Sequence, residues 1–408
     1  MSLLDHAIWW QIYPLGAVGA PIHGRRVLHF PGEDAGHRLR QLDAWLDYAI
    51  ELGCSGLLLG PIFESTAHGY DTVDHLRLDG RLGDDADWDH FVAECHRRGL
   101  AIVLDGVFNH VGVLHPLVEE CVAAGGGMVR VRDGVPEPWE GHGDLALLDH
   151  SDPRVADFVV DVMVHWLGRG AAGWRLDVAY AVPAEFWTAV IRRVREHHPD
   201  AIFIGEVIHG DYAEIARAAS LDSVTQYELW KAIWSSLVDQ NMWELAWALQ
   251  RHDEFSRELV TQTFVGNHDV DRIASKVGDV GAALAAVVLM TVPGMPSVYY
   301  GDEQGFRGEK VDGQWADAPV RPPLPPAPAD LAPNGAWLFR IYQDLIGLRR
   351  RNAWVTRGRL EVTGKQDEWI TYDVMGDGGR MSVRLDLGSR PRAEVLVNGA
   401  PAYAWQAD

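Results

Sequence analysis

The feature of this sequence that most constrains its fold is a regular alternation of short apolar runs with longer helical patterns. We expect eight of the apolar runs to be strands, at residues 7–13, 55–60, 101–107, 173–176, 201–204, 223–227, 260–265 and 297–300. Helices are expected at residues 39–52, 88–98, 154–167, 184–197, 228–251, 278–291 and 337–351. Such alternation is typical of repeated βα units that surround a parallel sheet.

The number of strands favours a closed (β/α)8 TIM barrel of the α/β class over an open doubly wound sheet, which normally has fewer strands. A chain of 408 residues, of which 47% are hydrophobic, can bury the large core that such a barrel needs. We expect the barrel to occupy residues 1–109 and 151–352, on either side of an interruption.

Three segments depart from this alternation. Residues 110–150 are rich in glycine and proline and too long for an ordinary loop, so we expect a small inserted subdomain after the third strand. Residues 301–333 carry a proline cluster and are expected to wall the site. After residue 352 the pattern changes to short alternating runs, which predicts a small C-terminal antiparallel β domain over residues 353–408.

Composition and charge exclude several classes of partner. The formal net charge of −22 would repel nucleic acid and anionic membranes, so neither is expected as a partner, whereas a neutral substrate is compatible with it. The cysteines, Cys54, Cys95 and Cys121, lack zinc-site spacing and are expected to be reduced. Because the first ten residues lack a basic signal-peptide region, we expect a cytoplasmic protein. The oligomeric state is left open.

Polar side chains stand directly after four of the expected strands, where a barrel places its active site. They include Asp105, Asp177, Glu206 and Asp269. A single carboxylate at a strand end is more often a helix cap, but several at one barrel mouth indicate a different role. Three carboxylates at one barrel mouth can attack an anomeric carbon, protonate a leaving oxygen and stabilise an oxocarbenium-like transition state. Arg175, on the same strand face as Asp177, would hold a neighbouring carboxylate ionised.

The blocks around these carboxylates resemble the signature regions of the α-amylase superfamily of glycoside hydrolases (glycoside hydrolase family 13). The resemblance covers nearly the whole chain, from WWQIYP at residues 9–14 and GYDT at 69–72 to GMPSVYYGDE at 294–303. It implies that Asp177 is the nucleophile, Glu206 the general acid/base and Asp269 the transition-state stabiliser. The side chains implied in substrate binding are Tyr70, Asp71, His110, Arg175, Asn267, His268 and Arg272.

Tryptophan positions add two candidates to this site, because the apolar face of a sugar packs well on an aromatic ring. Trp45 and Trp166 lie in apolar helical stripes and are expected in the core. Trp139, in the inserted segment, and Trp230, just after the sixth strand, are expected to line the substrate cleft.

The expected chemistry requires no cofactor, and a structural Ca²⁺ is left open. Many α-amylases place Lys and His three and four residues after the nucleophile, and that His supplies a backbone ligand to calcium. Here those positions hold Tyr180 and Ala181, which puts this calcium site in doubt. Asn109 with Asp144 or Asp149 offers oxygen ligands, but hydrogen bonding within the insertion explains these residues equally well.

Within the superfamily, YDT followed by RLG at 81–83, and LLD at 147–149, resemble most closely the cyclomaltodextrinase, neopullulanase and maltogenic amylase group. The resemblance implies hydrolysis of α-1,4-glucosidic bonds in maltooligosaccharides or related α-glucans, with retention through a covalent glycosyl-Asp intermediate. Two alternatives stay open. One is a transglycosylase or isomerase acting on trehalose- or sucrose-type α-glucosides, and the other is a catalytically silent sugar-binding barrel.

Overall fold

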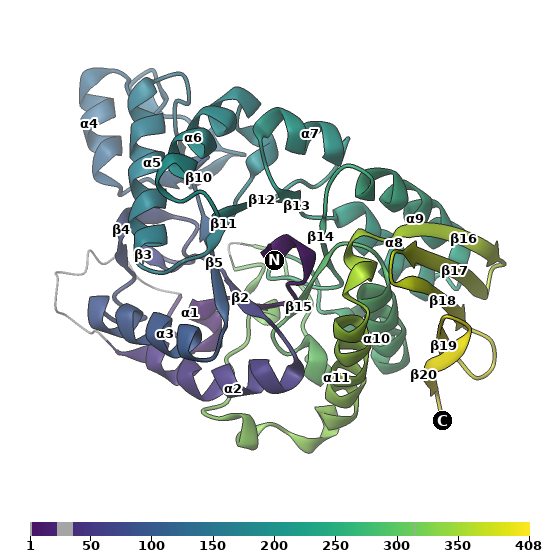
Figure 1. Cartoon of the computed structure of the whole chain (residues 1–408). Coiled ribbons are helices and arrows are strands. Elements are labelled where there is room, and N and C mark those ends of the chain that lie inside the picture. Colours follow the sequence, from purple (N-terminus) through teal and green to yellow (C-terminus); the bar gives the residue numbers. More distant parts are fainter. Residues whose placement is uncertain (1, 23–35, 314) are drawn as a thin grey trace.

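The structure of the chain is a computed structural model that describes residues 2–22, 36–313 and 315–408. A parallel bridge between Thr225 and Gln262, and a 2.9 Å hydrogen bond from the Gln226 amide to the Gln262 carbonyl, join the two end strands of its central sheet. The sheet is thereby closed into the (β/α)8 barrel that the sequence predicts (Figure 1). In spatial order its strands are β13 (Ser223–Val224), β12 (Ile202–Gly205), β11 (Gly173–Leu176), β5 (Ala101–Gly106), β2 (Gly56–Leu59), β1 (Trp9–Ile12), β15 (Met295–Tyr299) and β14 (Gln262–Phe264).

Helices surround the barrel because each has an apolar face that packs against the strands or a neighbouring helix. In α6 (Ala184–His197) the buried side chains recur with helical spacing, at Phe186, Trp187, Val190, Ile191 and Val194. The other helices that coincide with predicted ones are α2 (Asp43–Leu52), α3 (Asp85–Arg97), α5 (Pro153–Gly168), α10 (Ile273–Thr291) and α11 (Ala336–Arg351).

The single helix expected at residues 228–251 is wrong, because two helices occupy this region. α8 (Tyr227–Val238) ends before Gln240, which has a left-handed φ of 50°. α9 (Met242–Ser256) begins after Asn241, whose side chain caps it by accepting a hydrogen bond from the Trp243 amide. A further helix, α7 (Tyr212–Ala219), follows β12 and lies outside the predicted set.

The core has two parts, because successive side chains of a strand point to opposite faces. A larger cluster lies between the outer face of the strands and the helices, and it includes Trp45 and Trp166, which are 1% and 0% exposed. The packing role predicted for both tryptophans is confirmed. A smaller cluster on the inner face includes Trp9, Leu58, Val103 and Met295 from four strands, and Ile202 with Ile204 from β12.

Residues 110–150 form a small unit beside the carboxyl end of β5. β6 (His110–Gly112), β10 (His142–Leu147) and β9 (Pro138–Trp139) make a three-stranded antiparallel sheet. A short hairpin joins β7 (Val131–Arg132) to β8 (Val135–Pro136), and a helix, α4 (Pro116–Ala124), lies outside the predicted set. Because this unit follows β5 directly, it stands where a barrel has its active site.

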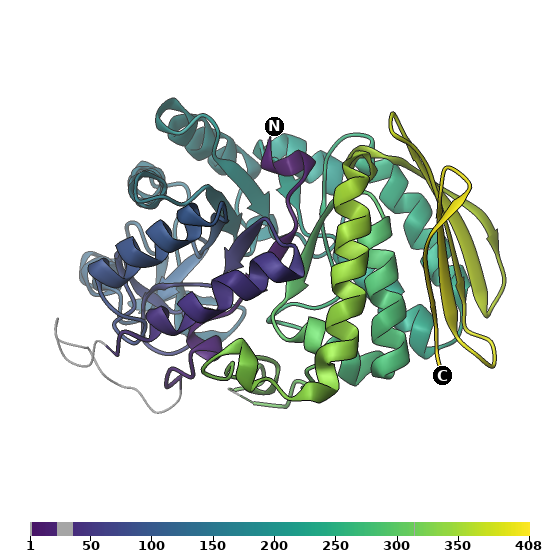
Figure 2. The ribbon, with the colours of Figure 1, turned by 60° about the horizontal axis from the view of Figure 1, so that its bottom comes forward.

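The last part of the chain is a five-stranded antiparallel sheet, which confirms the predicted C-terminal β domain. Its strands lie in sequence order, β16 (Arg359–Lys365), β17 (Trp369–Gly376), β18 (Gly379–Asp386), β19 (Arg392–Val397) and β20 (Ala400–Gln406). The sheet packs against α9 and α10 at one side of the barrel (Figures 1 and 2). Asp253 of α9 fastens it by accepting hydrogen bonds from Arg359 at 2.6 Å and from the Leu360 amide at 2.8 Å.

Within the described ranges, α10 is the one helix whose length and mean hydropathy of 1.7 would allow it to cross a membrane. In this protein 67% of that helical window is buried, and the helix packs against α8 and α11. α10 is therefore explained as a core helix of the barrel.

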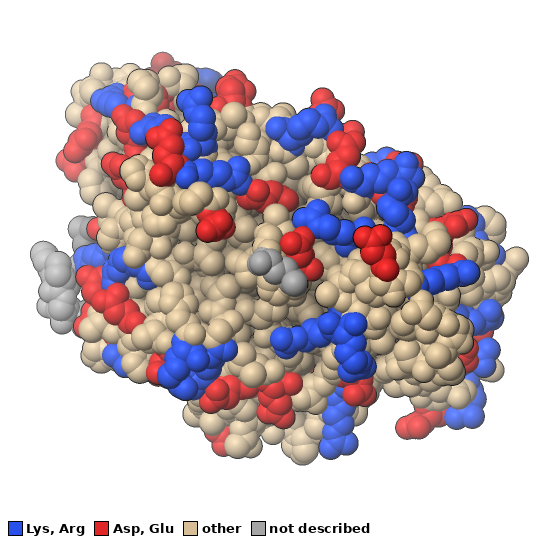
Figure 3. Space-filling model, in the orientation of Figure 1, with Lys and Arg blue, Asp and Glu red and all other residues tan. Residues whose placement is uncertain are grey.

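Charged side chains of both signs are interspersed on the face shown in Figure 3. The protein surface carries ion pairs such as Arg98 with Asp47 at 2.6 Å and Arg169 with Asp85 at 2.6 Å. Such exposed pairs add little stability individually. On this face the net charge of −22 is not gathered into one acidic patch.

Glu303, just after β15, is a buried carboxylic acid whose ionisation opposes folding. It accepts hydrogen bonds from the Tyr48 hydroxyl at 2.8 Å and the Gly301 amide at 3.0 Å, and burial raises its pKa from 4.5 to about 7. Because the pKa of Glu303 is higher in the folded chain than in the unfolded one, the free energy of unfolding falls as the pH rises from 4.5. The loss is complete above pH 7, where Glu303 is ionised in both states. We expect Glu303→Gln to raise the free energy of unfolding by about 3 kcal/mol at alkaline pH and by much less in acid, measured by urea denaturation.

Glu51→Gln on α2 is the matched control, because Glu51 is exposed. It should change the stability little at either pH. An equal gain from Glu303→Gln at both pH values would show that the ionisation of Glu303 is not the cause.

Candidate active site

A cavity of about 970 Å³ opens at the carboxyl ends of the barrel strands. Asp177, Glu206 and Asp269, the carboxylates that the sequence singles out, all line it. Residues 139–145 of the insertion, Trp139 included, form another part of its wall. Residues 315–318 and Arg321 line it too, so the proline-rich segment 301–333 contributes to the wall of the site.

Asp177 stands immediately after β11, and Arg175 lies two residues earlier on the same strand. The alternation of a strand places both side chains on one face, and both are buried. Arg175 Nη1 donates to Asp177 Oδ1 at 2.8 Å and to Asp105 Oδ1 at 2.7 Å. The arginine therefore fixes the orientation of the Asp177 carboxylate at the cavity wall.

Glu206 stands immediately after β12, the neighbour of β11 in the sheet. Its Oε1 lies 2.7 Å from Arg175 Nη2 and accepts a 3.2 Å hydrogen bond from the Tyr227 hydroxyl. Its Oε2 accepts a 2.9 Å hydrogen bond from the Val178 amide. One guanidinium thus contacts the carboxyl groups of Asp177 and Glu206 at the same time.

Asp269 follows β14 and is held by several partners. Its Oδ1 accepts a 2.9 Å hydrogen bond from Arg321 Nη2, and its Oδ2 lies 3.0 Å from His268 Nε2. Asn267 accepts a 2.8 Å hydrogen bond from the Asp269 amide and donates one of 2.9 Å to the Tyr227 hydroxyl. Asn267 lies behind the main cavity and therefore acts as a positioning residue.

Aromatic rings stack around these carboxylates. Tyr70 and His268 lie with their rings nearly parallel and their centroids 5.5 Å apart, and the Tyr70 hydroxyl donates to Asp105 Oδ2 at 2.9 Å. His110 stacks on Trp139 at 6.3 Å and lines the cavity. Among the described residues, His110 Nε2 is a buried nitrogen without a hydrogen-bond partner. Flat rings with polar atoms at their edges suit a saccharide.

The structure does not bring every predicted residue into this cavity. Asp71 lies beneath its wall, where it accepts a 3.0 Å hydrogen bond from the His68 amide. Trp230 lines a smaller neighbouring cavity. Arg272 is fully buried, so the prediction that it binds substrate is corrected. Its guanidinium forms an ion pair with Asp302 at 2.9 Å in the core and packs over the Tyr299 ring.

Three residues of the site were not assigned roles by the sequence analysis, namely Asp105, Tyr227 and Arg321. Asp105 lies at the end of β5, so the strand-end rule that singles out Asp177 also applies to it. Tyr227 begins α8 shortly after β13 and is the last residue of the strand expected at residues 223–227, so the rule did not mark it. Arg321 lies in the proline-rich segment and carries no pattern that marks it.

Burial dominates the titration of Asp105 and Asp177, which both contact Arg175. It raises the pKa of Asp105 to about 6 and that of Asp177 well above its usual range, and Arg175 opposes both shifts. Three carboxyl groups, those of Asp105, Asp177 and Glu206, share one positive charge. Because Asp105 and Asp177 contact the same guanidinium, we infer that their titrations are linked.

Asp269 is ionised at neutral pH. Burial opposes its ionisation, but His268, Arg321, Arg175 and Lys310 together lower its pKa to about 2. His268 itself is neutral at pH 7, because burial lowers its pKa to about 3. At that pH the stabilising positive charges are therefore those of the two arginines and the lysine.

The residues considered for a structural Ca²⁺ are already engaged in hydrogen bonds or near a histidine. Asn109 contacts the ring of His110 at 3.1 Å, and Asp149 accepts a 2.7 Å hydrogen bond from the Ser151 hydroxyl. Asp144 lies 3.9 Å from the ring of His68. No cluster of three His, Cys or acidic ligand atoms includes any of them in the parts of the chain that the structure describes.

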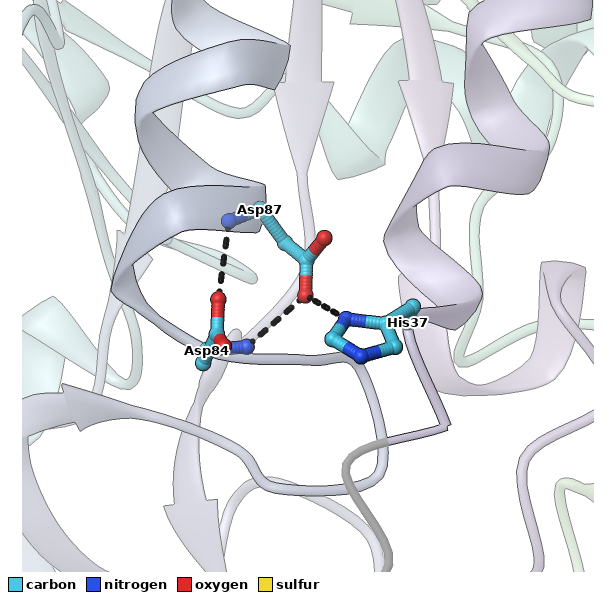
Figure 4. Close-up of side chains that lie close together, drawn as sticks. All are labelled: His37, Asp84 and Asp87. Carbon is cyan, nitrogen blue, oxygen red and sulfur yellow. Dashed lines mark hydrogen bonds and ion pairs between the residues drawn. The ribbon is translucent and has the colours of Figure 1, made fainter. Parts of the chain in front are cut away.

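The described residues do contain one such cluster, His37, Asp84 and Asp87, with ligand atoms within 4.8 Å of one another (Figure 4). Asp84 and Asp87 form the capping box of α3, in which each side chain accepts a hydrogen bond from the other's amide. Asp87 also accepts hydrogen bonds from His37 at 2.6 Å and from Arg40 at 2.7 Å. Helix capping and ion pairing therefore account for this cluster.

Comparison with known proteins agrees with this geometry. Neopullulanase 2 of Thermoactinomyces vulgaris is 31% identical over 87% of this chain and 63% of its own length. A cyclomaltodextrinase of Geobacillus thermopakistaniensis is 28% identical over 88% of this chain and 65% of its own. This chain thus spans less than two thirds of the length of these relatives.

Among solved structures, this chain superposes on the cyclic α-maltosyl-(1→6)-maltose hydrolase of Arthrobacter globiformis with a TM-score of 0.79 and 25% identity over 98% of both chains. That structure is a complex with cyclic α-maltosyl-(1→6)-maltose. The family model for the catalytic domain of α-amylase matches residues 37–128 and 141–321, which together are more than half of the chain. The resemblance seen in the sequence motifs is confirmed, and the chain belongs to the α-amylase family of glycoside hydrolases.

Proposed function

We propose that this chain is a retaining glycoside hydrolase that cleaves α-1,4-glucosidic bonds in maltooligosaccharides and related α-glucans. The observation that carries the proposal is the guanidinium of Arg175, which lies 2.8 Å from Asp177 Oδ1 and 2.7 Å from Glu206 Oε1. Two carboxyl groups held by one guanidinium lie close together. This arrangement suits direct attack of one of them on the anomeric carbon and leaves little room for a water molecule between them.

The reaction then runs in two steps. Asp177 attacks the anomeric carbon while Glu206 protonates the leaving oxygen, so the glycosidic bond breaks and a glycosyl-Asp177 ester forms. Glu206 next takes a proton from water, whose oxygen bonds to the anomeric carbon as the ester bond breaks. Asp269, ionised at neutral pH, supplies negative charge near the oxocarbenium-like transition states. Tyr70 and His110 position the sugar ring.

The names of the relatives support α-glucans as substrates, since they include neopullulanase, cyclomaltodextrinase and maltogenic amylase. We propose that no cofactor takes part, because the carboxyl groups supply the nucleophile, the acid and the base. We also propose a cytoplasmic location, which is supported by the intracellular maltogenic amylase of Bacillus subtilis, 27% identical over 74% of this chain.

Proton NMR of the first products tests the proposal, with maltotriose, maltoheptaose, a cyclodextrin, trehalose and sucrose as separate substrates. We expect cleavage of the maltodextrins with release of sugars in the α-anomeric form, because two displacements at one carbon retain its configuration. Initial release of the β-anomer would contradict the double displacement. A rearranged disaccharide without hydrolysis would favour an isomerase, and binding without any cleavage would favour a silent barrel.

A further inference from the structure

The side chain of Gln11, on β1, has no part in the two steps described above. Successive side chains of a strand alternate between its faces, so Gln11 points to the inner side of the barrel, as Trp9 does. It is only 4% exposed and lies outside the wall of the catalytic cavity. Within the described ranges its side chain makes one hydrogen bond, in which Gln11 Nε2 lies 3.2 Å from His268 Nδ1, and its Oε1 has no partner. Gln11 therefore reaches the site through His268.

The ring of His268 is held in a fixed plane. Tyr13 and Tyr70 lie nearly parallel to it, with ring centroids 6.1 Å and 5.5 Å away. The backbone carbonyl of His268 accepts a 2.8 Å hydrogen bond from Arg321 Nε. Stacking fixes the plane of an imidazole but not the position of its proton, which is decided by the polar groups at the two ring nitrogens.

The groups at Nε2 show where the ring proton lies. Asp269 is ionised at neutral pH and can only accept, so the His268 Nε2 that lies 3.0 Å from Asp269 Oδ2 must carry a proton. The Tyr70 hydroxyl points to the same arrangement. It donates to Asp105 and also contacts His268 Nε2, where its oxygen is left to accept. Both neighbours thus require a donor at Nε2.

A neutral imidazole has only one N–H group, so a proton on Nε2 leaves Nδ1 as an acceptor. His268 is neutral at pH 7, because burial lowers its pKa to about 3. The amide nitrogen of Gln11 is the donor that Nδ1 needs, whereas the amide oxygen would face a lone pair. Among the charged groups around the ring, Asp269 favours a second proton and three cations oppose it, namely Arg175, Lys310 and Arg321.

We propose that Gln11 is a positioning residue that keeps His268 neutral, with its one ring proton on Nε2 and directed at Asp269. The position of the proton follows from the contacts of His268, whereas its effect on catalysis rests on the proposed function. A neutral His268 orients the Asp269 carboxylate without cancelling its charge. That charge then stays available to the oxocarbenium-like transition states, which carry positive charge beside it. An imidazolium in contact with Asp269 would offset it.

Gln11→Glu in the full chain tests the proposal, because glutamate has the shape of glutamine but, when ionised, can only accept. A carboxylate at Nδ1 draws a second proton onto the ring, so we expect His268 to be protonated on both nitrogens at pH 7. NMR of protein with ¹⁵N-labelled histidine distinguishes a neutral ring from an imidazolium, and the His268 signals are identified by their loss in His268→Asn. On maltotriose we expect kcat to fall about 100-fold, with a much smaller change in KM.

Gln11→Met removes the donor without adding a charge, and it keeps the test valid where a buried carboxylate prevents folding. The neutral ring loses the hydrogen bond at Nδ1, so we expect the pKa of His268 to rise by about one unit. We expect kcat to fall about tenfold, because the edge of the ring that faces Asp269 is less firmly held.

Gln262→Glu is the matched control. Gln262 is a buried glutamine of β14 that lines the same small cavity behind the site as Gln11, and within the described ranges it has no hydrogen bond to His268. This variant also places a carboxylate inside the barrel, but we expect it to leave His268 neutral at pH 7.

A wild type that carries the ring proton on Nδ1 overturns the proposal and leaves the proposed function intact. So does a His268 that stays neutral in Gln11→Glu and keeps its wild-type pKa in Gln11→Met. Equal protonation of His268 in Gln11→Glu and Gln262→Glu would overturn it too, because any added carboxylate would then suffice. A wild type that cleaves no α-glucan overturns the proposed function and the catalytic effect of Gln11, while the NMR spectra still decide the position of the ring proton.

Discussion

Asp177→Asn is expected to lower kcat for maltotriose hydrolysis by about four to six orders of magnitude. The neutral amide cannot form the glycosyl ester, whereas its oxygen can still accept the hydrogen bond that Arg175 donates to Oδ1. The fold should therefore survive, with a thermal midpoint within about 2 °C of the wild type. Steady-state kinetics and thermal unfolding by circular dichroism measure the two quantities on the same preparation.

Glu206→Gln serves as the informative comparison, because its effect should depend on the leaving group. Maltotriose needs a proton on its departing oxygen, so we expect a loss of about 10³–10⁴-fold with this substrate. An aryl α-maltoside whose phenol departs unprotonated should still react with Asp177, and the glycosyl-enzyme should accumulate because its hydrolysis lacks the general base. Mass spectrometry of the intact protein would detect that adduct.

The exposed Asp161 of α5 provides the control, and Asp161→Asn should keep wild-type activity. Retained activity in Asp177→Asn, or an equal loss on both substrates in Glu206→Gln, would contradict the roles assigned to these two carboxyl groups.

The barrel could be predicted because each of its strands carries its own local signal. The pairing of β1 with β15 joins the first and the last strand of the barrel, which lie far apart in the sequence, and only the count of strands pointed to it. The division between α8 and α9 could not be predicted from periodicity. The helical pattern continues across residues 239–241, and Gln240 adopts its left-handed conformation without glycine to mark the turn.

The carboxylates of the site could be predicted for a related reason, since a residue that directly follows a barrel strand must lie at its mouth. Distance from the strand weakens this argument. Arg272 lies only three residues after Asp269, yet the chain has already turned into α10, for which Arg272 is the N-terminal cap position. Its side chain therefore points into the core toward Asp302. Arg321 shows the converse, because it reaches Asp269 from the end of a short 3-10 turn, Ala318–Val320, in the proline-rich segment.

Arg349→Met is expected to lower the free energy of unfolding by about 3–5 kcal/mol. Arg349 of α11 is buried and donates hydrogen bonds to the carbonyls of Met290 at 3.1 Å, Val292 at 2.6 Å and Gly294 at 2.6 Å. These carbonyls lie where α10 ends and the chain enters β15, and the positive charge also suits the negative end of the helix dipole.

Burial lowers the pKa of Arg349 to about 9, so the side chain is still charged at neutral pH and all three hydrogen bonds form. Methionine fills a similar volume but donates nothing, which leaves buried carbonyls unsatisfied at about 1–3 kcal/mol each, partly relieved by relaxation. Urea denaturation gives the change directly. Arg351→Met on the same helix is the control, because Arg351 is exposed and its replacement should stay within about 0.5 kcal/mol. Similar losses in both variants would show that the buried carbonyls do not depend on Arg349.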